Sequence, residues 1–229
     1  MEAIILAGGK AERLGDAAGG RPKALVEIAG KPLAAYQVGR LVHAGVTRVI
    51  FACAAGQGSL FESELAGLGA EIVAAEEPER LGRGGGIKFA ARQRREGGDV
   101  FALNGDELVD VDYQGLLVAH RANGALATIT VAQPRSQFGL VDVDDDDVVH
   151  GFREGGQVAF WVNCGNYVLT AETIERFPDQ GDHESTTFPE LAAEGALRAF
   201  RHTGLWLTVN TPKELRVAQE HVAAHPEWL

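Results

Sequence analysis

The sequence lacks the features that mark secreted and membrane-spanning proteins. It has only two cysteines, Cys53 and Cys164, without paired spacing, which argues against a disulfide framework or a zinc site. No apolar run approaches the roughly 18 residues that a membrane-spanning helix needs. The first residues enter an apolar segment directly, without the basic region and cleavage site of a signal peptide. We therefore expect a cytoplasmic protein without a membrane partner.

Positive charge is also scarce. The chain has 21 Lys and Arg against 32 Asp and Glu, a formal net charge of −11, which disfavours binding to nucleic acid or to an anionic membrane. Basic side chains nevertheless gather in two segments: Lys10, Arg13, Arg21, Lys23 and Lys31 in the first, and Arg80, Arg83 and Lys88 in the second. This pattern indicates a small anionic ligand, and the alternative is a basic face exposed to solvent.

The first half of the chain has the pattern of βαβ units. Hydrophobic residues make up 45% and charged residues 23%, which is typical of a globular protein. Short β-forming runs alternate with helical patterns, which predicts an α/β fold: a Rossmann-like, mostly parallel central sheet with helices on both faces. The predicted strands are 3–6, 48–52, 71–75 and 100–103, and the predicted helices are 32–43, 59–68 and 84–95.

The second half mixes strands of a different kind with helices. Leu140–Val143 and Val148–Phe152 alternate apolar and polar residues around the acidic run Asp144–Asp147, which predicts a hairpin with a solvated turn. We predict a single domain over 1–229, with one half at about 1–112 and a mixed or antiparallel half at about 113–229. The other predicted strands are 125–131, 160–169 and 205–209, and the helices are 113–121, 171–177, 188–194 and 212–224.

A double glycine, Gly8 and Gly9, follows the first predicted strand. Ligands of open α/β sheets bind at the carboxyl ends of strands, and glycine lets backbone amides approach a phosphate closely. The planar guanidinium of Arg13 can hold two pyrophosphate oxygens, and Lys23 is a compact charge suited to one phosphate. The spacing matches neither a Walker A loop nor G-x-G-x-x-G.

Asp106 follows the predicted strand 100–103. A carboxylate in this place is a natural Mg²⁺ ligand, because Mg²⁺ commonly uses one or two carboxylates plus phosphates. The alternative is a turn or helix-capping residue. We expect its neighbours Glu107, Asp110 and Asp112 to be solvated. The run 84–86, Gly-Gly-Gly, either presents amides to an anion at a helix start or forms a flexible turn.

Together these motifs resemble the signature of the sugar-1-phosphate nucleotidyltransferases. The resemblance begins with Leu6-Ala7-Gly8-Gly9-x₃-Arg13-Leu14 and Arg21-Pro22-Lys23-Ala24-Leu25-Val26. It continues in the family's order with Leu81-Gly82, Leu103-Asn104-Gly105-Asp106, Phe138-Gly139, Phe152-x-Glu154, Asn163-Cys164-Gly165, Trp206 and Thr211-Pro212. It covers nearly the whole chain, and the most similar pattern is that of mannose-1-phosphate or heptose-phosphate guanylyltransferases.

The resemblance implies an enzyme with a nucleotide-binding first half and a sugar-phosphate-binding second half. Its reaction would be Mg²⁺-dependent nucleotidyl transfer from a nucleoside triphosphate to a sugar 1-phosphate, giving an NDP-sugar and pyrophosphate. The implied site residues are Arg13, Lys23 and Asp106 for catalysis, Asp106 for the metal, Leu6, Ala7, Gly8, Gly9, Glu77 and Gly82 for the nucleotide, and Gly139, Glu154 and Asn163 for the sugar phosphate.

The sequence constrains the identity of the nucleotide base less than any other part of the implied reaction. Similar enzymes bind the base where Glu77 lies. A carboxylate matches the adjacent N1–H and N2–H donors of guanine, whereas uracil and thymine offer one such donor. This favours GTP over UTP or dTTP, provided that Glu77 is not simply exposed.

The chain departs from the family's pattern at three positions. Gly155 and Ser185 stand where lysines are common, and Thr208 stands where a second metal-binding aspartate is expected. Asn210 is the nearest oxygen donor that could replace it. Two alternatives therefore remain: a catalytically weak paralogue that binds a nucleotide sugar and regulates a partner, and a transferase for a non-sugar phosphate such as phosphocholine. The sequence does not predict the oligomeric state.

Overall fold

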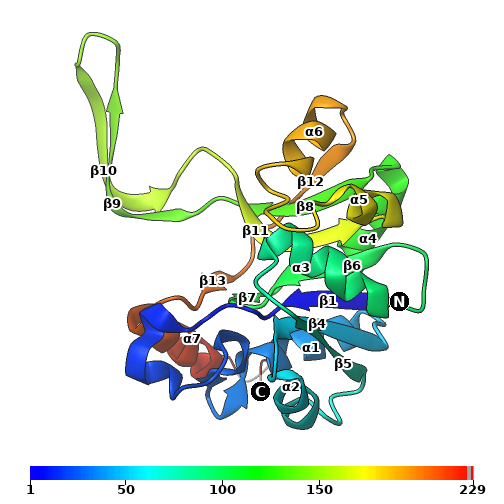
Figure 1. Cartoon of the computed structure of the whole chain (residues 1–229). Helices are drawn as coiled ribbons and strands as arrows, with labels where there is room; N and C mark the ends of the chain where they lie inside the picture. Colours follow the sequence, from blue (N-terminus) through cyan, green and yellow to red (C-terminus); the bar gives the residue numbers. More distant parts are fainter. Residues whose placement is uncertain (226–227, 229) are drawn as a thin grey trace.

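The centre of the molecule is a seven-stranded sheet. The computed structural model describes residues 1–225 and 228, and the strand order is β12-β8-β11-β6-β1-β4-β5 (Figure 1). Only β11 runs antiparallel to its neighbours in this sheet, so the predicted mostly parallel α/β sheet is confirmed. The strands are β1 (Glu2–Leu6), β4 (Arg48–Ala54), β5 (Glu71–Glu77), β6 (Val100–Asn104), β8 (Ala127–Ala132), β11 (Val162–Leu169) and β12 (Leu197–Arg201).

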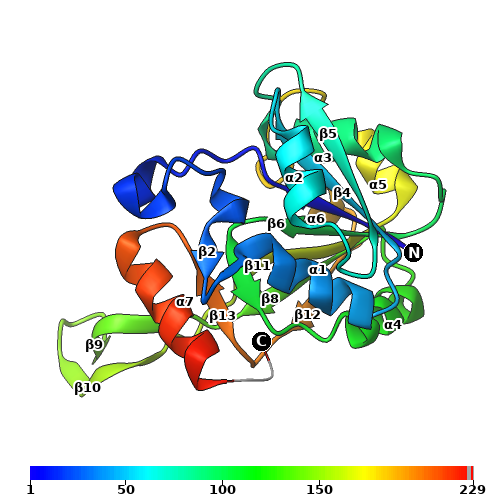
Figure 2. The same cartoon turned by 90° about the horizontal axis from the view of Figure 1, so that it is seen from below.

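Helices cover both faces of this sheet (Figures 1 and 2). Successive side chains of a strand point to opposite faces, so Ala3 and Ile5 of β1 join one core cluster and Ile4 joins the other. This explains the unbroken apolar run of β1, which is buried on both sides. The first face is covered by α1 (Leu33–His43), α2 (Gly58–Glu64) and α4 (Tyr113–Asn123), and the second by α3 (Gly82–Ala90), α5 (Ala171–Arg176) and α6 (Thr187–Ala193).

A third core cluster lies under the loop that follows β1. Leu14 and Ile28 pack there against Leu215 and Val222 of α7 (Pro212–Ala224). Helix α7 has the predicted bounds because a capping box and a proline define its first turn. Six short elements complete this region: the 3-10 helices Glu12–Ala18 and Lys23–Leu25, the paired strands β2 (Glu27–Ile28) and β3 (Lys31–Pro32), and the paired strands β7 (Glu107–Val109) and β13 (Trp206–Thr208).

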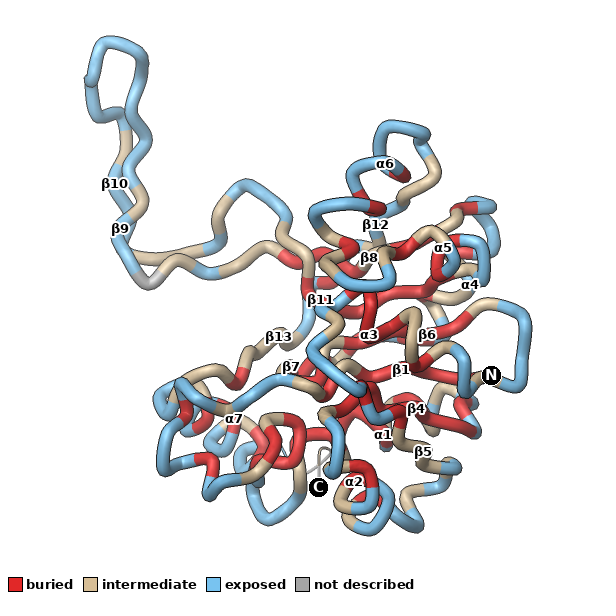
Figure 3. The backbone as a smooth tube through the Cα atoms, viewed as in Figure 1, coloured by how far each residue is buried: buried red, intermediate tan, exposed pale blue. Residues whose placement is uncertain are grey.

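The predicted hairpin is present and is longer than expected. It consists of β9 (Arg135–Val143) and β10 (Val149–Gln157), and we call residues 135–157 the arm. The arm projects away from the rest of the molecule (Figure 1), and most of it is exposed (Figure 3). No helix among residues 1–225 and 228 is long and apolar enough to cross a bilayer.

Candidate active site

A cavity of about 220 Å³ lies at the carboxyl ends of β1, β5 and β6. A larger cavity of about 680 Å³ adjoins it and shares Gly8, Gly9, Glu77 and Arg80. All six residues predicted to bind the nucleotide line the first cavity, and so do Lys23 and Asp106. The full lining is Leu6, Ala7, Gly8, Gly9, Lys23, Ala24, Glu77, Arg80, Gly82, Arg83, Asn104, Gly105 and Asp106.

Strand pairing brings Asp106 to this cavity. Leu6 at the end of β1 lies in register with Asn104 at the end of β6. The Gly105 amide then donates to the Leu6 carbonyl oxygen at 2.9 Å. A Cβ at position 105 would overlap that same oxygen, so the turn requires glycine. The next residue is therefore held beside the glycines of the loop after β1.

Hydrogen bonds link the three predicted catalytic residues through the side-chain amide of Asn210 and the ammonium group of Lys23. The Lys23 ammonium donates to Asp106 Oδ2 at 2.7 Å and also to Asn210 Oδ1. The Arg13 guanidinium donates to the same Asn210 oxygen at 3.3 Å. The Lys23 side chain is 11% exposed and the Asp106 side chain is 33% exposed. Both line the cavity, so their ion pair forms part of its wall. Lys23 and Asp106 thus border one end of the cavity, whereas Arg13 lines neither cavity and is joined to Lys23 through Asn210.

Asn210 reaches this position through pairing with a distant segment. Thr208 of β13 lies in register with Glu107 of β7, and the Val209 amide donates to the Asp106 carbonyl oxygen at 2.9 Å. The Asn210 amide donates to the Glu214 carboxylate at 2.7 Å, which anchors it at the start of α7. The sequence marked Asn210 only as a substitute oxygen donor, and the structure adds its contacts with both cations.

Our expectation that Glu107 is solvated was wrong. The residue is 7% exposed, and its carboxyl group accepts from Asn104 Nδ2 at 3.4 Å and Trp206 Nε1 at 3.3 Å. Burial, and secondarily the charge of Asp106, raise the pKa of Glu107 to about 8. The cause is the unpredicted β7–β13 pairing, which turns this side chain inward.

The other two acidic neighbours also have partners. Asp110 Oδ1 lies 3.0 Å from His202 Nε2. Burial acts to raise the pKa of Asp110, but His202, the Leu205 backbone and Arg40 together lower it. Asp112 stays exposed, as expected, and caps α4 by accepting from the Gly115 amide at 2.9 Å. Neither residue lines the cavity at Asp106.

Glu77 lies at another end of the cavity and is 8% exposed, so the alternative of a merely exposed side chain is excluded. Its Oε2 accepts from the Leu81 amide at 3.1 Å. Burial raises the pKa of Glu77, against the opposing effects of this amide and of Arg80. A Cβ at Gly86 would lie 2.7 Å from Oε1, so this glycine makes room for the carboxyl group.

The glycines at 84–86 fit neither of the two expectations. They are buried inside α3, which begins at Gly82. A Cβ at Gly85 would lie 2.5 Å from the Asp179 carbonyl oxygen, and one at Gly84 would lie 2.9 Å from the His183 amide nitrogen. The glycines therefore permit close packing of α3 on the segment 178–183, which fixes the start of the helix at the cavity.

Arg83 connects the cavity to the second half of the chain. It lines the cavity, donates to Asp182 from Nε at 2.8 Å and forms an ion pair with Glu184 at 3.0 Å. Glu184 also accepts from Asn163 Nδ2 at 2.9 Å and from the Tyr167 hydroxyl at 3.2 Å. The predicted sugar-phosphate residue Asn163 is thereby linked to the nucleotide side. The sequence placed Arg83 only in a basic segment. Its partner Glu184 lies 101 residues later in the chain, so no local sequence pattern predicts this ion pair.

Gly139 and Glu154 are in a different place. They lie opposite each other on the arm, both are exposed, and they line neither cavity. A Cβ at Gly139 would lie 2.7 Å from Cζ of Phe152, so packing of this ring explains the glycine. Their contact with a sugar phosphate stays a prediction.

The donor groups at Asp106 are compatible with a Mg²⁺ ion that arrives with a nucleotide. Among residues 1–225 and 228, no three His, Cys, Asp or Glu side chains gather as a metal-binding group. One partly exposed carboxylate and one amide oxygen are present, from Asp106 and Asn210. Mg²⁺ often takes one carboxylate from the protein and its other ligands from phosphates and water.

Comparison with known proteins gives a consistent result. A family model described as "Nucleotidyl transferase" matches residues 2–225. Mannose-1-phosphate guanyltransferase beta-A of Xenopus laevis is 31% identical over 245 residues, which cover 100% of this chain and 68% of that protein. Mannose-1-phosphate guanylyltransferase of Mycobacterium tuberculosis is 33% identical over 228 residues, which cover 93% of this chain and 62% of that protein.

Solved structures extend the comparison. HddC from Yersinia pseudotuberculosis superposes with a TM-score of 0.74 at 26% identity, covering 96% of this chain and 98% of that chain. The same protein complexed with GMP-PN gives a TM-score of 0.73 at 25% identity, with the same coverage.

Proposed function

Since the chain belongs to the nucleotidyl transferase family, we propose that it transfers a guanylyl group from GTP to a sugar 1-phosphate. The products are a GDP-sugar and pyrophosphate. The observation that carries this proposal is the Lys23–Asp106 ion pair at one end of a cavity whose other end holds the buried Glu77, with Arg13 joined to Lys23 through Asn210. The mannose-1-phosphate guanylyltransferases to which the chain is similar support the choice of substrates.

The reaction is an in-line displacement at the α-phosphorus. An oxygen of the sugar phosphate forms the new P–O bond, and the bond to pyrophosphate breaks. The acceptor is already anionic, so no general base is needed, and catalysis comes from positioning and charge neutralisation. In this proposal Lys23 leaves Asp106 to contact a phosphate, Arg13 holds the departing pyrophosphate, and the amides of Gly8 and Gly9 face the triphosphate.

Mg²⁺, when bound, would supply charge neutralisation at the phosphates, and Asp106 would hold it with Asn210 nearby. Because the protein offers one carboxylate here, we expect Mg²⁺ to bind with the nucleotide and only weakly to the nucleotide-free protein. Calorimetric titration of Mg²⁺ with and without GTP measures this. Tight binding without nucleotide would contradict it.

Glu77 supports guanine as the base. Its Oε2 already accepts from the Leu81 amide, and Oε1 lies beside Gly8 and Gly86, whose missing side chains leave it space. A carboxylate oriented in this way can accept from N1–H and N2–H of guanine. UTP and dTTP are the competing donors to test.

The acceptor side is proposed to include Asn163, Glu184 and Arg83, which form a connected polar group at the edge of the cavity. Carboxylate and amide groups can bind sugar hydroxyls, and Arg83 can contact a phosphate if it exchanges its carboxylate partners. Arg83 supplies a positive charge on the acceptor side, whereas Gly155 and Ser185 stand where the family commonly has lysines. The two free, buried cysteines agree with the reducing cytoplasm that we propose as its location.

One experiment tests the proposal against its alternatives. Pyrophosphate release is measured with GTP, UTP and dTTP, each paired with mannose 1-phosphate, other sugar 1-phosphates or phosphocholine. We expect the highest kcat/KM with GTP and a sugar 1-phosphate, and loss of release in Asp106→Asn. Release with phosphocholine alone would support the non-sugar acceptor. Ligand-induced thermal stabilisation without release in any pair would support the non-catalytic paralogue.

A further inference from the structure

Asn210 joins two of the three predicted catalytic side chains. Its Oδ1 accepts from the Lys23 ammonium and from Arg13 Nη2, the latter at 3.3 Å. Both cations belong to the segment after β1, which runs beside the start of α7 (Figures 1 and 2). An amide oxygen has two lone pairs, so these two contacts use its full capacity to accept hydrogen bonds. The two cations therefore share a single neutral atom.

The backbone around Asn210 is held on both sides. The Val209 amide donates to the Asp106 carbonyl oxygen at 2.9 Å, and the Val209 side chain is fully buried. The Asn210 and Thr211 amides donate to Glu214 Oε2 at 2.7 and 3.0 Å, beside the capping box that begins α7. The Asn210 side chain thus extends toward the two cations from a backbone that is fixed by packing and hydrogen bonds.

The two cations depend on Asn210 to different extents. Arg13 is exposed, and its bond to Asn210 is the only hydrogen bond or ion pair that its side chain makes with residues 1–225 and 228. Lys23 is mostly buried and also pairs with Asp106 at 2.7 Å. In the proposed reaction Lys23 leaves Asp106 to contact a phosphate, and Asn210 then remains as its partner. Removing the Asn210 oxygen would therefore release Arg13 and take away the partner that Lys23 keeps.

The neutral charge of Asn210 matters as much as its position. Arg13 and Lys23 carry two positive charges against the one negative charge of Asp106, so the group attracts phosphate anions. A carboxylate at position 210 would hold the same cations, but it would cancel the remaining positive charge and compete with phosphate oxygens. An amide oxygen binds a cation more weakly than a phosphate oxygen does, so a phosphate can displace it.

We propose that Asn210 is a positioning residue for pyrophosphate. Its amide oxygen holds the Arg13 guanidinium beside the Lys23 ammonium, and its neutrality preserves their charge for the phosphate groups. The inference rests on the proposed function, because pyrophosphate is the leaving group of that reaction. It adds that the two cations act as one coupled unit and not as two independent phosphate ligands.

Titration of inorganic pyrophosphate into the protein, with Mg²⁺ present, tests this role without turnover. Asn210→Ala removes the shared oxygen and should weaken pyrophosphate binding roughly tenfold, the scale of one charge-assisted hydrogen bond. Asn210→Asp keeps an oxygen but cancels a positive charge, so binding should be weaker by a further factor of about ten. Arg216→Ala is the control, because Arg216 is exposed on α7 and lines neither cavity. Wild-type affinity in Asn210→Ala, or tighter binding in Asn210→Asp than in Asn210→Ala, overturns the proposal.

A double-mutant cycle separates positioning from a general structural effect. Arg13→Lys alone is also expected to weaken pyrophosphate binding about tenfold. Independent residues would give the product of the two effects, roughly 100-fold, in the double variant. If Asn210 acts through Arg13, Arg13→Lys should add less than about threefold in the Asn210→Ala protein. A double variant that shows the full product would contradict coupling of the two residues.

Mg²⁺ binding to the nucleotide-free protein gives a readout of opposite sign. Asn210 and Asp106 contact the same Lys23 ammonium, so Asn210→Asp places a second carboxylate near Asp106. Mg²⁺ should then bind roughly tenfold more tightly than to the wild type, because Mg²⁺ prefers charged oxygens. Damage to the fold would weaken binding of both Mg²⁺ and pyrophosphate, and thermal melting checks for it. Weaker Mg²⁺ binding in a folded Asn210→Asp would reject the placement of Asn210 beside Asp106.

Turnover is measured separately, with GTP and mannose 1-phosphate. A wild type that binds pyrophosphate, with variants in the expected order of affinity, but releases none from GTP would contradict the proposed function and support the role of Asn210. A wild type that binds no pyrophosphate would overturn the role of Asn210.

Discussion

The two ends of the central sheet use their charged side chains differently. At the amino ends of β1, β4 and β5, Glu2, Arg48 and Glu71 lie in register, so that charges of alternating sign are direct neighbours. At the carboxyl ends, Lys23 and Asp106 also form a pair, but that pair borders a cavity. The comparison teaches that one sheet holds buried charge pairs under a covering segment at its amino end, which we call the closed end, and a charge pair beside the predicted nucleotide cavity at its carboxyl end, which we call the open end.

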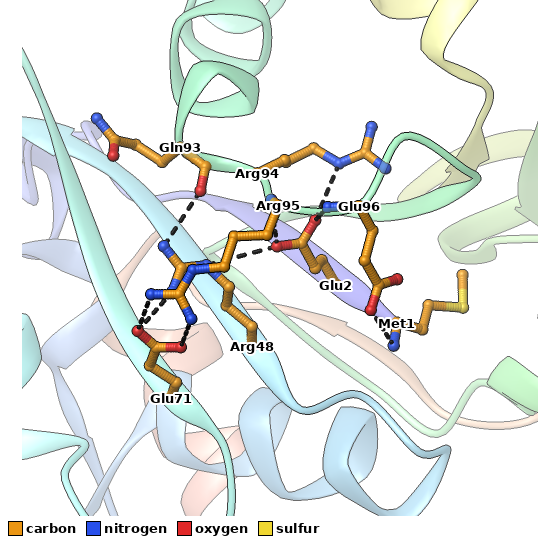
Figure 4. Close-up of polar contacts among 8 residues, drawn as sticks. All are labelled: Met1, Glu2, Arg48, Glu71, Gln93, Arg94, Arg95 and Glu96. Atoms are coloured by element: carbon orange, nitrogen blue, oxygen red, sulfur yellow. Dashed lines mark hydrogen bonds and ion pairs between the residues drawn. The ribbon is translucent and has the colours of Figure 1, made fainter.

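The amino end is closed by the segment after α3. Figure 4 shows the Glu2 carboxylate among the residues of this segment. Glu2 is 2% exposed and accepts from the backbone amides of Arg95 at 2.9 Å and Glu96 at 3.1 Å, with Arg94 Nε at 3.4 Å. Arg95 in turn makes two hydrogen bonds to Glu71, at 2.8 and 3.0 Å. The donors from residues 94–96 surround the Glu2 carboxylate, so it has no contact that a ligand could replace.

The largest effect is expected at the open end. Asp106→Asn keeps the size and shape of the side chain but removes the carboxylate beside Lys23. Turnover should fall roughly 100-fold or more, the scale seen when an electrostatic stabiliser of the transition state is lost. The melting temperature should change little. Pyrophosphate-release kinetics and thermal melting test both parts, and near-normal turnover would remove Asp106 from the mechanism.

The reciprocal change is at the closed end. Glu2→Gln leaves Arg94 and Arg48 near a buried neutral group, so stability should fall by about 2–3 kcal/mol and the melting temperature by roughly 5–10 °C. The kcat should stay at the wild-type value below the melting range. Urea unfolding and steady-state kinetics are the measurements. A large loss of kcat in the folded variant would contradict the separation of the two ends.

Local patterns predicted the sheet, and long-range pairing hid part of the site. The apolar run of β1 and the capping box of α7 are local signals, and both elements are confirmed. By contrast, β7 is three residues long and forms only because β13 pairs with it from about 100 residues away. No periodicity marks such a strand, which is why the burial of Glu107 and the contacts of Asn210 were missed.

Edge position explains another omission. Strand β12 was not predicted because it pairs on one side only and carries the exposed residues Arg198 and Arg201. Gly8, Gly9 and Asp106, which line the first cavity, were found because the loop after β1 and the turn after β6 have local glycine signatures. Partners such as Arg83 and Glu184 depend on how α3 packs, which the sequence did not show.

Acid should weaken the open end through His183. This side chain is fully buried, stacks on Phe177 at 4.7 Å, and has no hydrogen-bond partner at either ring nitrogen among the described residues. Burial lowers the pKa of His183 from 6.5 to about 4. Between these values the unfolded state binds more protons, so stability is present above pH 6.5 and is lost as pH falls toward 4.

His183→Phe tests this difference in pH dependence. The variant should unfold with a weaker pH dependence between 6.5 and 4, and the difference at pH 4 should reach about 2–3 kcal/mol. Urea unfolding at several pH values measures it. Parallel curves for wild type and His183→Phe would show that His183 is not the cause.

The smallest effect is expected for a substitution that keeps the charge at the open end. Arg13→Lys retains a cation near Asn210 but loses the planar pair of donors that can hold two pyrophosphate oxygens at once. Losing one charge-assisted hydrogen bond corresponds to roughly a tenfold weaker interaction. In the reverse reaction the KM for pyrophosphate should therefore rise about tenfold, while the KM for the nucleotide sugar changes less. Arg198→Ala is a suitable control, because Arg198 is exposed on the edge strand β12 and lines neither cavity. An unchanged pyrophosphate KM in Arg13→Lys would show that the guanidinium does not hold the leaving group, and the role would pass to Lys23.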